Sequence, residues 1–441
     1  MEDIGIKYYY KDIDDRIERK QYPGTIKERY SDFVVSEITR HDVCSEQEVE
    51  PELSKIKEIL KNYISDLSFL DQIEETPRLL CEIELDDKSE RAVIHEIMRN
   101  HPLIKTKTVG NTIQIFFGED RSIFYHCTLK KINRDTVEAC NIICRLLKIP
   151  YQNIKFCGNK DKRAITYQII SIEGTTYTDL QNLKKKLLLE DGPCGVWIYN
   201  IRNASGHVKL GDLLGNKFKI KIKTDYSDEL INLYQSEKEV SFINYFGNQR
   251  FGMNMDNHFI GKNIIENNYE KCIDMIMKSN SMDNELVSAA KVLFKKGDFI
   301  EALEKLPARF IVERNICRGR LKGLSAKRII DGIKREIRLL YLHSYQSYLF
   351  NIAINNKIED GFTLDQNDVF IDDTLALPLK SFKEKKLKGC NRKIVEKMKN
   401  FKIRKVDDGV EVEFDLAPST YATIALRELI GNCVLFQKSI I

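Results

Sequence analysis

Alternating and helical hydrophobic patterns both occur along this chain of 441 residues. The segment Lys217–Lys223 (KFKIKIK) alternates strictly, with Phe218, Ile220 and Ile222 on one face and four lysines on the other. Such alternation is typical of a half-buried strand, here with a basic outer surface. Further strands are predicted over Asp32–Ile38, Thr112–Phe117, Tyr167–Glu173 and Glu411–Leu416.

Helical spacing is clearest in three segments. Asn133–Lys148 begins with Asn and Asp near its cap and places Val137, Cys140, Cys144 and Leu147 on one side, which predicts an amphipathic helix. Glu285–Lys305 is also helical in pattern, and Ser325–Ile354 predicts one or two long helices with a thick apolar stripe. Strands thus dominate the first half and the C-terminal end, with helices between them. This order predicts an α+β fold whose sheet is completed by the C-terminus and interrupted by a helical insertion.

Composition excludes several classes of protein. With 42% apolar and 31% charged residues the chain can fill a packed core, so it is not a disordered protein. No apolar run is long enough for a membrane span, and the N-terminal MEDIGIKYYYKDIDDR lacks the apolar core of a secretory signal. Eleven cysteines occur without a CxxC pair. We therefore expect a reduced protein of the nucleus, the cytoplasm or both, without a structural zinc.

The net charge of +4 conceals a polarised sequence. Residues 42–86 carry 13 acidic and 4 basic side chains, whereas residues 309–338 carry 10 basic and 3 acidic, and residues 379–405 carry 12 basic and 2 acidic. Each block could be a solvated face, and the cluster Lys383–Lys388 could serve nuclear import or RNA binding equally well. Two basic blocks in one half of the chain favour an extended polyanionic partner.

The most unusual stretch is Lys155–Glu173 (KFCGNKDKRAITYQIISIE), where a turn presents Asp161 among Lys160, Lys162 and Arg163. Neighbouring positive charge favours the ionised carboxylate, which could act as a nucleophile or a base at neutral pH. The same cations disfavour a divalent metal. The alternative is an ordinary surface turn in which Asp161 pairs with Arg163.

Two further segments could contact a nucleic acid. Asn244–Gly252 (NYFGNQRFG) combines aromatic residues with glycines that permit close backbone approach, so its rings could stack on a base taken out of its helix. The alternative is a tight turn with core aromatics. Arg91 and His95 share one helical face, where they could meet phosphate or form an ordinary surface pair. Motifs for nucleoside triphosphates, dinucleotides and zinc hydrolases are absent from the sequence: Gly211–Lys217 (GDLLGNK) has one residue too few for a phosphate loop.

Taken together and in this order, seven segments resemble the TruD family of pseudouridine synthases, especially its eukaryotic-type members. They are SDFVVSEI (31–38), HCTLKKINRDTVEA (126–139), FCGNKDKRAITYQ (156–168), KLGDLLGNKFKI (209–220), NYFGNQRFG (244–252), HSYQSYLFN (343–351) and FDLAPSTYATIALREL (414–429). The resemblance covers residues 28–440 apart from 45–80. Asn159 and Ala417-Pro418-Ser419 depart from the family pattern and put only loop geometry in doubt.

The resemblance implies a pseudouridine synthase catalytic domain formed by residues 1–50, 119–265 and 396–441. Its sheet would be mixed and mainly antiparallel. A largely helical TruD-type insertion would span 266–395, and a small α/β insertion resembling an Arg-xxx-His module would span 51–118. Asp161 matches the catalytic aspartate of the family. The candidate substrate-binding residues are Phe246, Asn244, Glu37, Tyr421, Lys160 and Arg250, and the candidate RNA backbone contacts are Arg91, His95, Lys162 and Arg163.

The implied activity is isomerisation of uridine to pseudouridine in tRNA, typically at position 13, and in other structured RNA. The reaction transfers no electrons and donates no group, so no cofactor or metal is expected, and we expect a monomer that binds RNA and no membrane. A catalytically inactive RNA-binding or RNA-folding protein on the same scaffold is the main alternative. Retention of Asp161, Asn244 and Phe246 argues against it, and the cations around Asp161 disfavour a metal-dependent nuclease.

Overall fold

A computed structural model of the chain describes residues 2–13, 22–40, 42–48, 53–72, 74–189, 195–252, 254–280, 283–361, 370–371, 392–431 and 434–435. It divides into two compact units, each assembled from three stretches of sequence. The sheet unit comprises Tyr22–Val240, Met398–Ser419 and Asn432–Ile441, and the helical unit comprises Met1–Gln21, Ser241–Lys397 and Thr420–Gly431.

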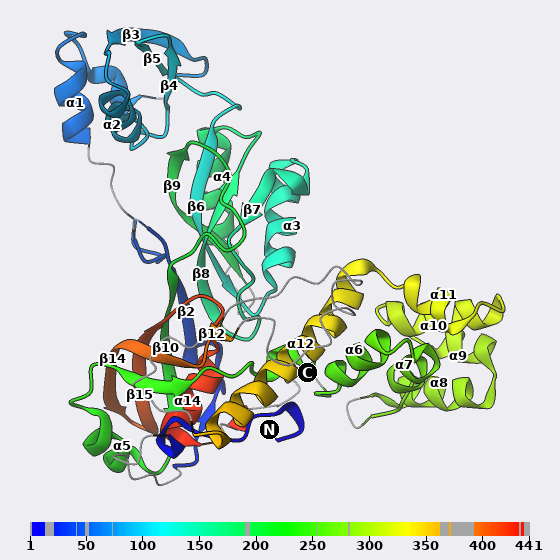
Figure 1. Cartoon of the computed structure of the whole chain (residues 1–441). Helices are drawn as coiled ribbons and strands as arrows, with labels where there is room; N and C mark the ends of the chain where they lie inside the picture. The colour runs from blue at the N-terminus through cyan, green and yellow to red at the C-terminus, as the bar shows by residue number, and fades with distance from the viewer. Residues whose placement is uncertain are drawn as a thin grey trace. The chain divides into compact units, whose positions relative to one another are not determined.

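The sheet unit is built on a mixed, mainly antiparallel sheet (Figure 1). The central path runs β14-β15-β10-β2-β8-β6-β9, and its one parallel neighbour pair is β2 with β8. Off this path, β1 pairs with β10 and β16, and β7 pairs with β8. The bounds are β1 Thr25–Ile26, β2 Phe33–Ile38, β6 Phe124–Ile132, β7 Ile154–Phe156, β8 Ile165–Ile172, β9 Val196–Ala204, β10 Gly215–Lys223, β14 Val395–Val406, β15 Gly409–Leu416 and β16 Val434–Leu435. The predicted α+β class with such a sheet is confirmed.

Strand β10 shows how the sequence pattern defines the sheet. Phe218, Ile220 and Ile222 are buried, as the alternation predicts. The four lysines lie on the outer face, as predicted, but each lies within 4 Å of a carboxylate, which the alternation does not reveal. The ammonium groups of Lys217, Lys219, Lys221 and Lys223 pair with Glu413, Glu411, Asp408 and Glu28 at 3.9, 3.4, 3.7 and 3.4 Å. Pairing with carboxylates of β15 and of neighbouring loops therefore compensates the charge of this face.

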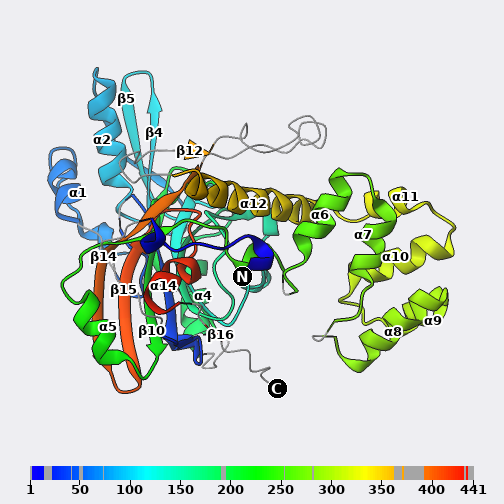
Figure 2. The same cartoon turned by 60° about the horizontal axis from the view of Figure 1, so that its bottom comes forward.

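Three helices of the sheet unit are α3 Thr136–Leu147, α4 Tyr177–Leu189 and α5 Ser227–Tyr234. Figure 2 shows α5 beside β15. The predicted α3 forms, but its buried stripe contains Ala139, Cys140, Ile143 and Cys144, whereas Val137 is 44% exposed. At about 100° per residue, Val137 lies at the edge of this stripe rather than on it. The prediction that Val137 belongs to the apolar face is therefore wrong.

A small α/β region within the sheet unit has a core of its own. Its antiparallel sheet has the order β3-β5-β4, with β3 Arg78–Glu84, β4 Ile104–Val109 and β5 Thr112–Phe117. Helices α1 (Leu53–Leu60) and α2 (Lys88–Met98) accompany it. The buried residues Ile56, Met98 and Ile115 join both helices and the sheet in one hydrophobic cluster.

The helical unit contains most of the predicted helical stretch (Figure 1). Its helices are α6 Asn257–Ile265, α7 Tyr269–Ile276, α8 Glu285–Lys296, α9 Phe299–Lys305, α10 Ile311–Leu321, α11 Ala326–Asp331, α12 Arg335–Glu359 and α14 Ala422–Ile430, and its short strands are β11 Val240–Ile243, β12 Phe370–Ile371 and β13 Arg392–Lys393. Ser325–Ile354 thus forms two helices. Packing of α6 on α12 is so close that a Cβ at Gly261 would lie 2.1 Å from the carbonyl oxygen of Tyr341, which requires glycine there.

Candidate active site

Asp161 lies in the loop between β7 and β8 of the sheet unit. Its carboxylate Oδ2 is 3.5 Å from the ammonium Nζ of Lys27, and the Asp161 side chain keeps 21% of its surface exposed. Lys27 is buried, has φ +63° and lies 3.8 Å from the centre of the Phe33 ring. From β6, the buried Lys131 donates a hydrogen bond of 2.8 Å to the backbone carbonyl of Asp161. Lys27 therefore holds the carboxylate of Asp161, and Lys131 holds its backbone.

Burial shapes the titration of both lysines. It lowers the pKa of Lys27, and the neighbouring Asp161 carboxylate opposes this shift by favouring the charged ammonium. Burial likewise lowers the pKa of Lys131 to about 8, again against the attraction of Asp161. Because the pKa of Lys131 stays above neutrality, its ammonium is mostly protonated at pH 7. Asp161 therefore sits in a locally positive environment.

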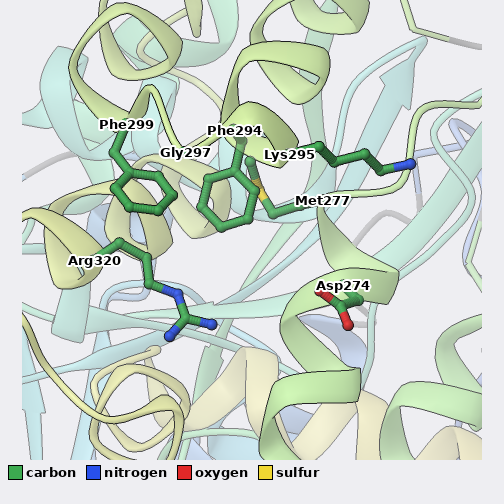
Figure 3. A pocket seen from close by; sticks show the side chains of 7 residues that line it. All are labelled: Asp274, Met277, Phe294, Lys295, Gly297, Phe299 and Arg320. Atoms are coloured by element: carbon green, nitrogen blue, oxygen red, sulfur yellow. The ribbon is translucent and has the colours of Figure 1, made fainter.

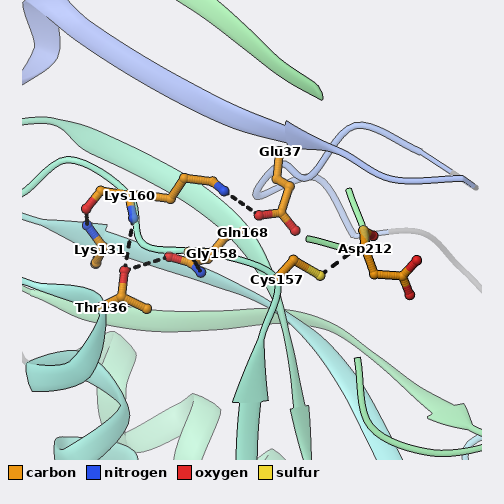
Figure 4. Close-up of polar contacts among 8 residues, drawn as sticks. All are labelled: Glu37, Lys131, Thr136, Cys157, Gly158, Lys160, Gln168 and Asp212. Carbon is orange, nitrogen blue, oxygen red and sulfur yellow. Dashed lines mark hydrogen bonds and ion pairs between the residues drawn. The ribbon is translucent and has the colours of Figure 1, made fainter. Parts of the chain in front are cut away.

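Glu37 and Lys160 form a buried ion pair beside this loop (Figure 4). Lys160 Nζ is 2.5 Å from Glu37 Oε2, and the two side chains are 5% and 0% exposed. Glu37 belongs to β2, where its DFVVSEI motif alternates between buried and half-buried positions. The pair thus ties the aspartate loop to the centre of the sheet.

Neutral hydrogen bonds complete the loop (Figure 4). Thr136 Oγ1 accepts a hydrogen bond of 3.2 Å from the Lys160 backbone N–H and donates one of 3.0 Å to Gln168. Gln168 in turn donates to the carbonyl of Gly158 at 3.0 Å. All three polar side chains on which the loop depends here, Thr136, Gln168 and Lys131, are buried. The loop conformation is therefore fixed before Asp161, at Gly158 and Lys160, and at the Asp161 carbonyl itself.

The cations next to Asp161 in sequence mostly serve other groups. Lys160 pairs with Glu37, and the exposed Lys162 pairs with Asp135 at 3.8 Å. Arg163 donates a hydrogen bond of 3.3 Å to the carbonyl of Glu28. The sequence analysis considered only the cations next to Asp161 in the chain and missed Lys27, whose ammonium lies 3.5 Å from the Asp161 carboxylate. Its position just before the DFVVSEI strand was the available signal.

The aromatic candidates lie together in the helical unit. Phe246 packs edge to face on Phe350 and Tyr421, with ring centroids 5.2 and 6.1 Å apart. The guanidinium carbon of Arg250 is 5.4 Å from the centre of the Phe246 ring. Phe246 is only 6% exposed, whereas Tyr421, at the N-terminus of α14, is partly exposed.

Neighbouring aromatics of the NYFGNQRFG segment serve the core. Tyr245 and Phe251 are fully buried, and the Tyr245 hydroxyl donates a hydrogen bond of 2.6 Å to Asn355. The alternative of a turn with core aromatics therefore describes these two residues. Asn244 is also buried, and its amide donates to the carbonyl of Lys393 at 3.1 Å.

Sequence analysis also missed Arg392, which was counted within the basic block 379–405. Its guanidinium is buried and lies 4.2 Å from the centre of the Phe246 ring. Residues 379–391 of that block, including Lys383–Lys388, lie outside the described residues. In the described part, Arg404 and Lys405 pair with Glu411 and Asp228. Counting charges cannot separate such buried or paired cations from those that meet solvent.

Arg91 and His95 both lie on α2, as their spacing predicted. His95 Nδ1 and Nε2 are 2.5 and 2.8 Å from the hydroxyls of Thr106 and Thr108. Arg91 donates to the carbonyls of Leu85 and Asp86. Burial, followed by the charge of neighbouring arginines, lowers the pKa of His95. Both side chains thus bond within the small α/β region.

A separate cavity of about 470 Å³ lies among α7, α8, α9 and α10 (Figure 3). The rings of Phe294 and Phe299 stand side by side with centroids 5.1 Å apart, and Arg320 pairs with Glu270 near them. None of the candidate site residues lines this cavity. Among the described residues no cluster of histidine, cysteine or carboxylate side chains could hold a metal ion, and no helix is long and apolar enough to span a membrane.

Comparison with known proteins identifies the family. Residues 81–378 match the family model described as tRNA pseudouridine synthase D (TruD). This match covers more than half of the chain and includes Asp161, Asn244 and Phe246, while Glu37 and Tyr421 lie outside it. The chain belongs to the TruD family of tRNA pseudouridine synthases.

Individual relatives span two domains of life. The human pseudouridylate synthase 7 homolog is 30% identical over 378 residues, which is 77% of this chain and 56% of the human protein. The chain thus spans little more than half the length of that relative. A tRNA pseudouridine synthase D of Methanococcus maripaludis is 28% identical over 70% of this chain and 85% of its own length. In fold, the crystal structure of a Methanosarcina mazei protein titled as tRNA pseudouridine synthase D matches 97% of both chains at 19% identity, with a TM-score of 0.58.

Proposed function

We propose that this chain isomerises uridine to pseudouridine in tRNA, at position 13, and in other structured RNA, with Asp161 as the catalytic carboxylate. The observation that carries the proposal is the buried setting of the GNKDKRA loop. Asp161 remains partly exposed there while Lys27 pairs with its carboxylate and Lys131 holds its backbone. Family membership supports the same activity.

The reaction needs only what side chains can supply. The bond between N1 of uracil and C1′ of ribose breaks, the detached base turns, and a bond forms between C5 and C1′. C5 loses a proton and N1 gains one, so no oxidant, reductant or donated group is required. The target nucleotide must first leave its stack, at a cost of a few kcal/mol. An ionised carboxylate beside the nucleotide and a wall that retains the base are the essential parts.

Phe246 and Tyr421 form the proposed wall. The partly exposed Tyr421 ring would meet the uracil, with Phe246 packed behind it at 6.1 Å between centroids. Asn244 and Arg250 adjoin Phe246 and would shape the same pocket for the base. Glu37 and Lys160 would hold the Asp161 loop in position, since their ion pair is buried.

Exposed cations of the helical unit are the proposed RNA contacts. Five side chains between α10 and the start of α12 are exposed and carry no ion pair in the part of the chain that the structure describes: Lys322, Lys327, Arg328, Lys334 and Arg335. Two other cations of the block 309–338 form ion pairs within the helical unit: Arg320 pairs with Glu270, and Arg338 pairs with Asp331. Cations that meet solvent can release counterions from an RNA backbone. Arg91, His95, Lys162 and Arg163 are proposed as further backbone contacts.

The proposed organisation follows the family pattern. A catalytic domain of residues 1–50, 119–265 and 396–441 would hold Asp161, with the small α/β region (51–118) and the helical region (266–395) as RNA-binding insertions. The chain would act as a monomer on tRNA in the nucleus, the cytoplasm or both. The separate core of the small α/β region supports treating it as an insertion.

The test is an Asp161→Asn variant, which keeps the shape of the side chain and removes its charge. We expect pseudouridine formation to fall by about a thousandfold or more, while tRNA binding changes by less than about threefold, because backbone contacts are untouched. Mass spectrometry of a tRNA transcript measures the product, and filter binding measures affinity. Asp135→Asn is the matched control, since it makes the same substitution at an exposed carboxylate that pairs with Lys162 at 3.8 Å.

Substantial turnover by Asp161→Asn would contradict the catalytic assignment. A wild-type protein that binds tRNA tightly but forms no pseudouridine would favour an inactive RNA-binding or RNA-folding protein. Activity that is lost with a chelator would point to a metal-dependent enzyme instead.

A further inference from the structure

Arg392 contacts two of the proposed substrate-binding residues at once. The residue is only 7% exposed, and it lies in the short strand β13 of the helical unit. Its Nη2 donates a hydrogen bond of 2.5 Å to the side-chain oxygen of Asn244. Its Nε donates one of 3.2 Å to the Asn244 backbone carbonyl. The same guanidinium lies 4.2 Å from the centre of the Phe246 ring.

The geometry exploits the planar guanidinium. Its carbon is also 5.6 and 5.8 Å from the ring centres of Phe350 and Tyr421. A cation over a ring is attracted by the negative π face, and this attraction strengthens where water is excluded. A lysine could supply the charge but not the fork that reaches two Asn244 oxygens while stacking on Phe246. Arg392 therefore connects the amide and the ring in a defined relative orientation.

Other groups also hold the backbone of the segment. The Phe246 N–H donates to Asn351 at 2.8 Å, and the Phe246 carbonyl accepts from Asn351 at 3.1 Å. The Asn244 N–H donates to the carbonyl of Ile394 at 2.7 Å. Arg392 adds backbone contacts of its own, because Nη2 also donates a hydrogen bond of 3.4 Å to the carbonyl of Tyr245. Loss of the guanidinium would therefore loosen this segment and release the Asn244 and Phe246 side chains that Arg392 orients.

We propose that Arg392 is a positioning residue of the uracil-binding wall, which acts through Phe246 and Asn244 without touching the base. This inference rests on the proposed function, because the wall matters only if a uracil is retained during the reaction. Positioning groups lower the barrier by holding the reacting geometry before the chemical step. They therefore affect kcat more than the binding of an RNA whose affinity comes from backbone contacts.

The test compares Arg392→Lys and Arg392→Gln with the control Lys291→Gln. Lys291 also has a buried ammonium in the helical unit, 2.9 Å from Asp283, but it lies away from the aromatic wall on α8. We expect both Arg392 variants to lower kcat by about ten- to hundredfold with KM changed by less than about threefold, and Lys to restore little. Lys291→Gln should lower the melting temperature but leave kcat unchanged at temperatures where it is folded.

A double-mutant cycle shows whether Arg392 acts through the ring. In a Phe246→Leu background, Arg392→Lys should lower single-turnover rates by less than about threefold, because the ring that it positions is already gone. Full additivity of the two substitutions would overturn the proposal. So would a rise in KM with an unchanged kcat, which would assign Arg392 to RNA binding.

Hydrogen exchange separates this inference from the proposed function. In Arg392→Gln, amides of residues 244–247 should exchange at least about tenfold faster than in the wild type, because the segment loses the hydrogen bonds from Arg392 to the Asn244 and Tyr245 carbonyls and opens more often. Lys291→Gln should raise exchange only around α8. Unchanged protection of residues 244–247 would refute the positioning role even if the enzyme proved inactive. An inactive wild type with the expected exchange pattern would instead refute the proposed function.

Discussion

The loop around Asp161 and the aromatic cluster around Phe246 illustrate two ways of holding a functional side chain. The Asp161 loop depends on charge: Lys27 pairs with the aspartate, and Lys160 pairs with Glu37 inside the sheet unit. The Phe246 cluster in the helical unit depends on shape. There, rings meet edge to face and the Arg392 guanidinium spans neutral oxygens and a ring face.

The difference predicts different sensitivities. Removing one partner of a buried ion pair leaves an uncompensated charge in a medium that solvates it poorly, so the whole local structure is destabilised. Removing one contact from an aromatic cluster costs much less, since the remaining surfaces still pack. The stability of the Asp161 loop should also depend on pH, because ion pairs hold it. The stability of the Phe246 cluster should depend on pH only where a buried titratable side chain lies in the same unit.

Glu37→Gln should have the largest effect on stability. It leaves the Lys160 ammonium buried without its carboxylate, which costs about 3–5 kcal/mol of unfolding free energy. Denaturant unfolding followed by hydrogen exchange should place this loss in the sheet unit, with protection of residues 244–247 in the helical unit retained. An equal loss of protection at residues 244–247 would break the contrast between the two regions.

Two variants serve as its controls. Asp228→Asn removes a carboxylate that pairs with Lys405 at the surface, where an ion pair contributes less than about 1 kcal/mol. The double variant Glu37→Gln with Lys160→Met removes both buried charges and should regain stability relative to Glu37→Gln alone. If the double variant is no more stable, the unpaired charge is not the cause of the loss.

The two regions should also differ in their response to pH. In the helical unit, burial lowers the pKa of His258 to about 4, only partly opposed by Asp3, and its ring packs on Tyr348. The unfolded chain then binds more protons between pH 6.5 and 4, so stability falls as the pH drops through this range. The limit of the effect is about 3 kcal/mol. His258→Phe should flatten this acid-side decline in a series of melts.

The sheet unit should respond on the alkaline side. Burial lowers the pKa of Lys131 to about 8, against 10.5 for an exposed lysine. Its destabilising contribution is complete below pH 8 and is relieved as the pH rises toward 10.5, because the folded state then holds fewer protons than the unfolded chain. Lys131→Met should remove this rise from hydrogen-exchange stabilities of the sheet unit. A shared pH profile for both units would contradict the assignment.

Local sequence motifs predicted individual strands and site residues better than the contacts between residues that are distant in the chain. The strict alternation of KFKIKIK defines β10 because burial on one face requires a period of two. Asp161 was identified from its motif. Its direct partner Lys27 was not, because the two residues meet only through the order of strands in the sheet. Spacing along the chain carries no information about such contacts.

Arg392 shows the same limit for charge patterns. Ten or more basic residues in a block indicate a polyanion surface only if they reach solvent without a carboxylate partner. Arg392 is buried, whereas Arg404 and Lys405 are exposed but pair with Glu411 and Asp228. Burial against an aromatic ring cannot be distinguished from exposure by counting. In the block 309–338, therefore, only the structure identifies which cations are exposed.

Neutralising four of these exposed cations should weaken RNA binding without changing the chemistry. In the variant Lys327→Gln, Arg328→Gln, Lys334→Gln and Arg335→Gln, each lost phosphate contact reduces the slope of log affinity against log salt by about 0.7–0.9. Filter binding at several salt concentrations measures the slope, and kcat at saturating RNA should stay within about twofold.

The matched control replaces the four lysines of β10 with Gln, an equal change in net charge at side chains that already pair with carboxylates. Because their charge is locally compensated, their loss should change the slope by less than about one. Equal slopes for the two variants would show that net charge alone governs binding. A smaller slope only for the variant at residues 327, 328, 334 and 335 would place contacts with the RNA backbone on the helical unit.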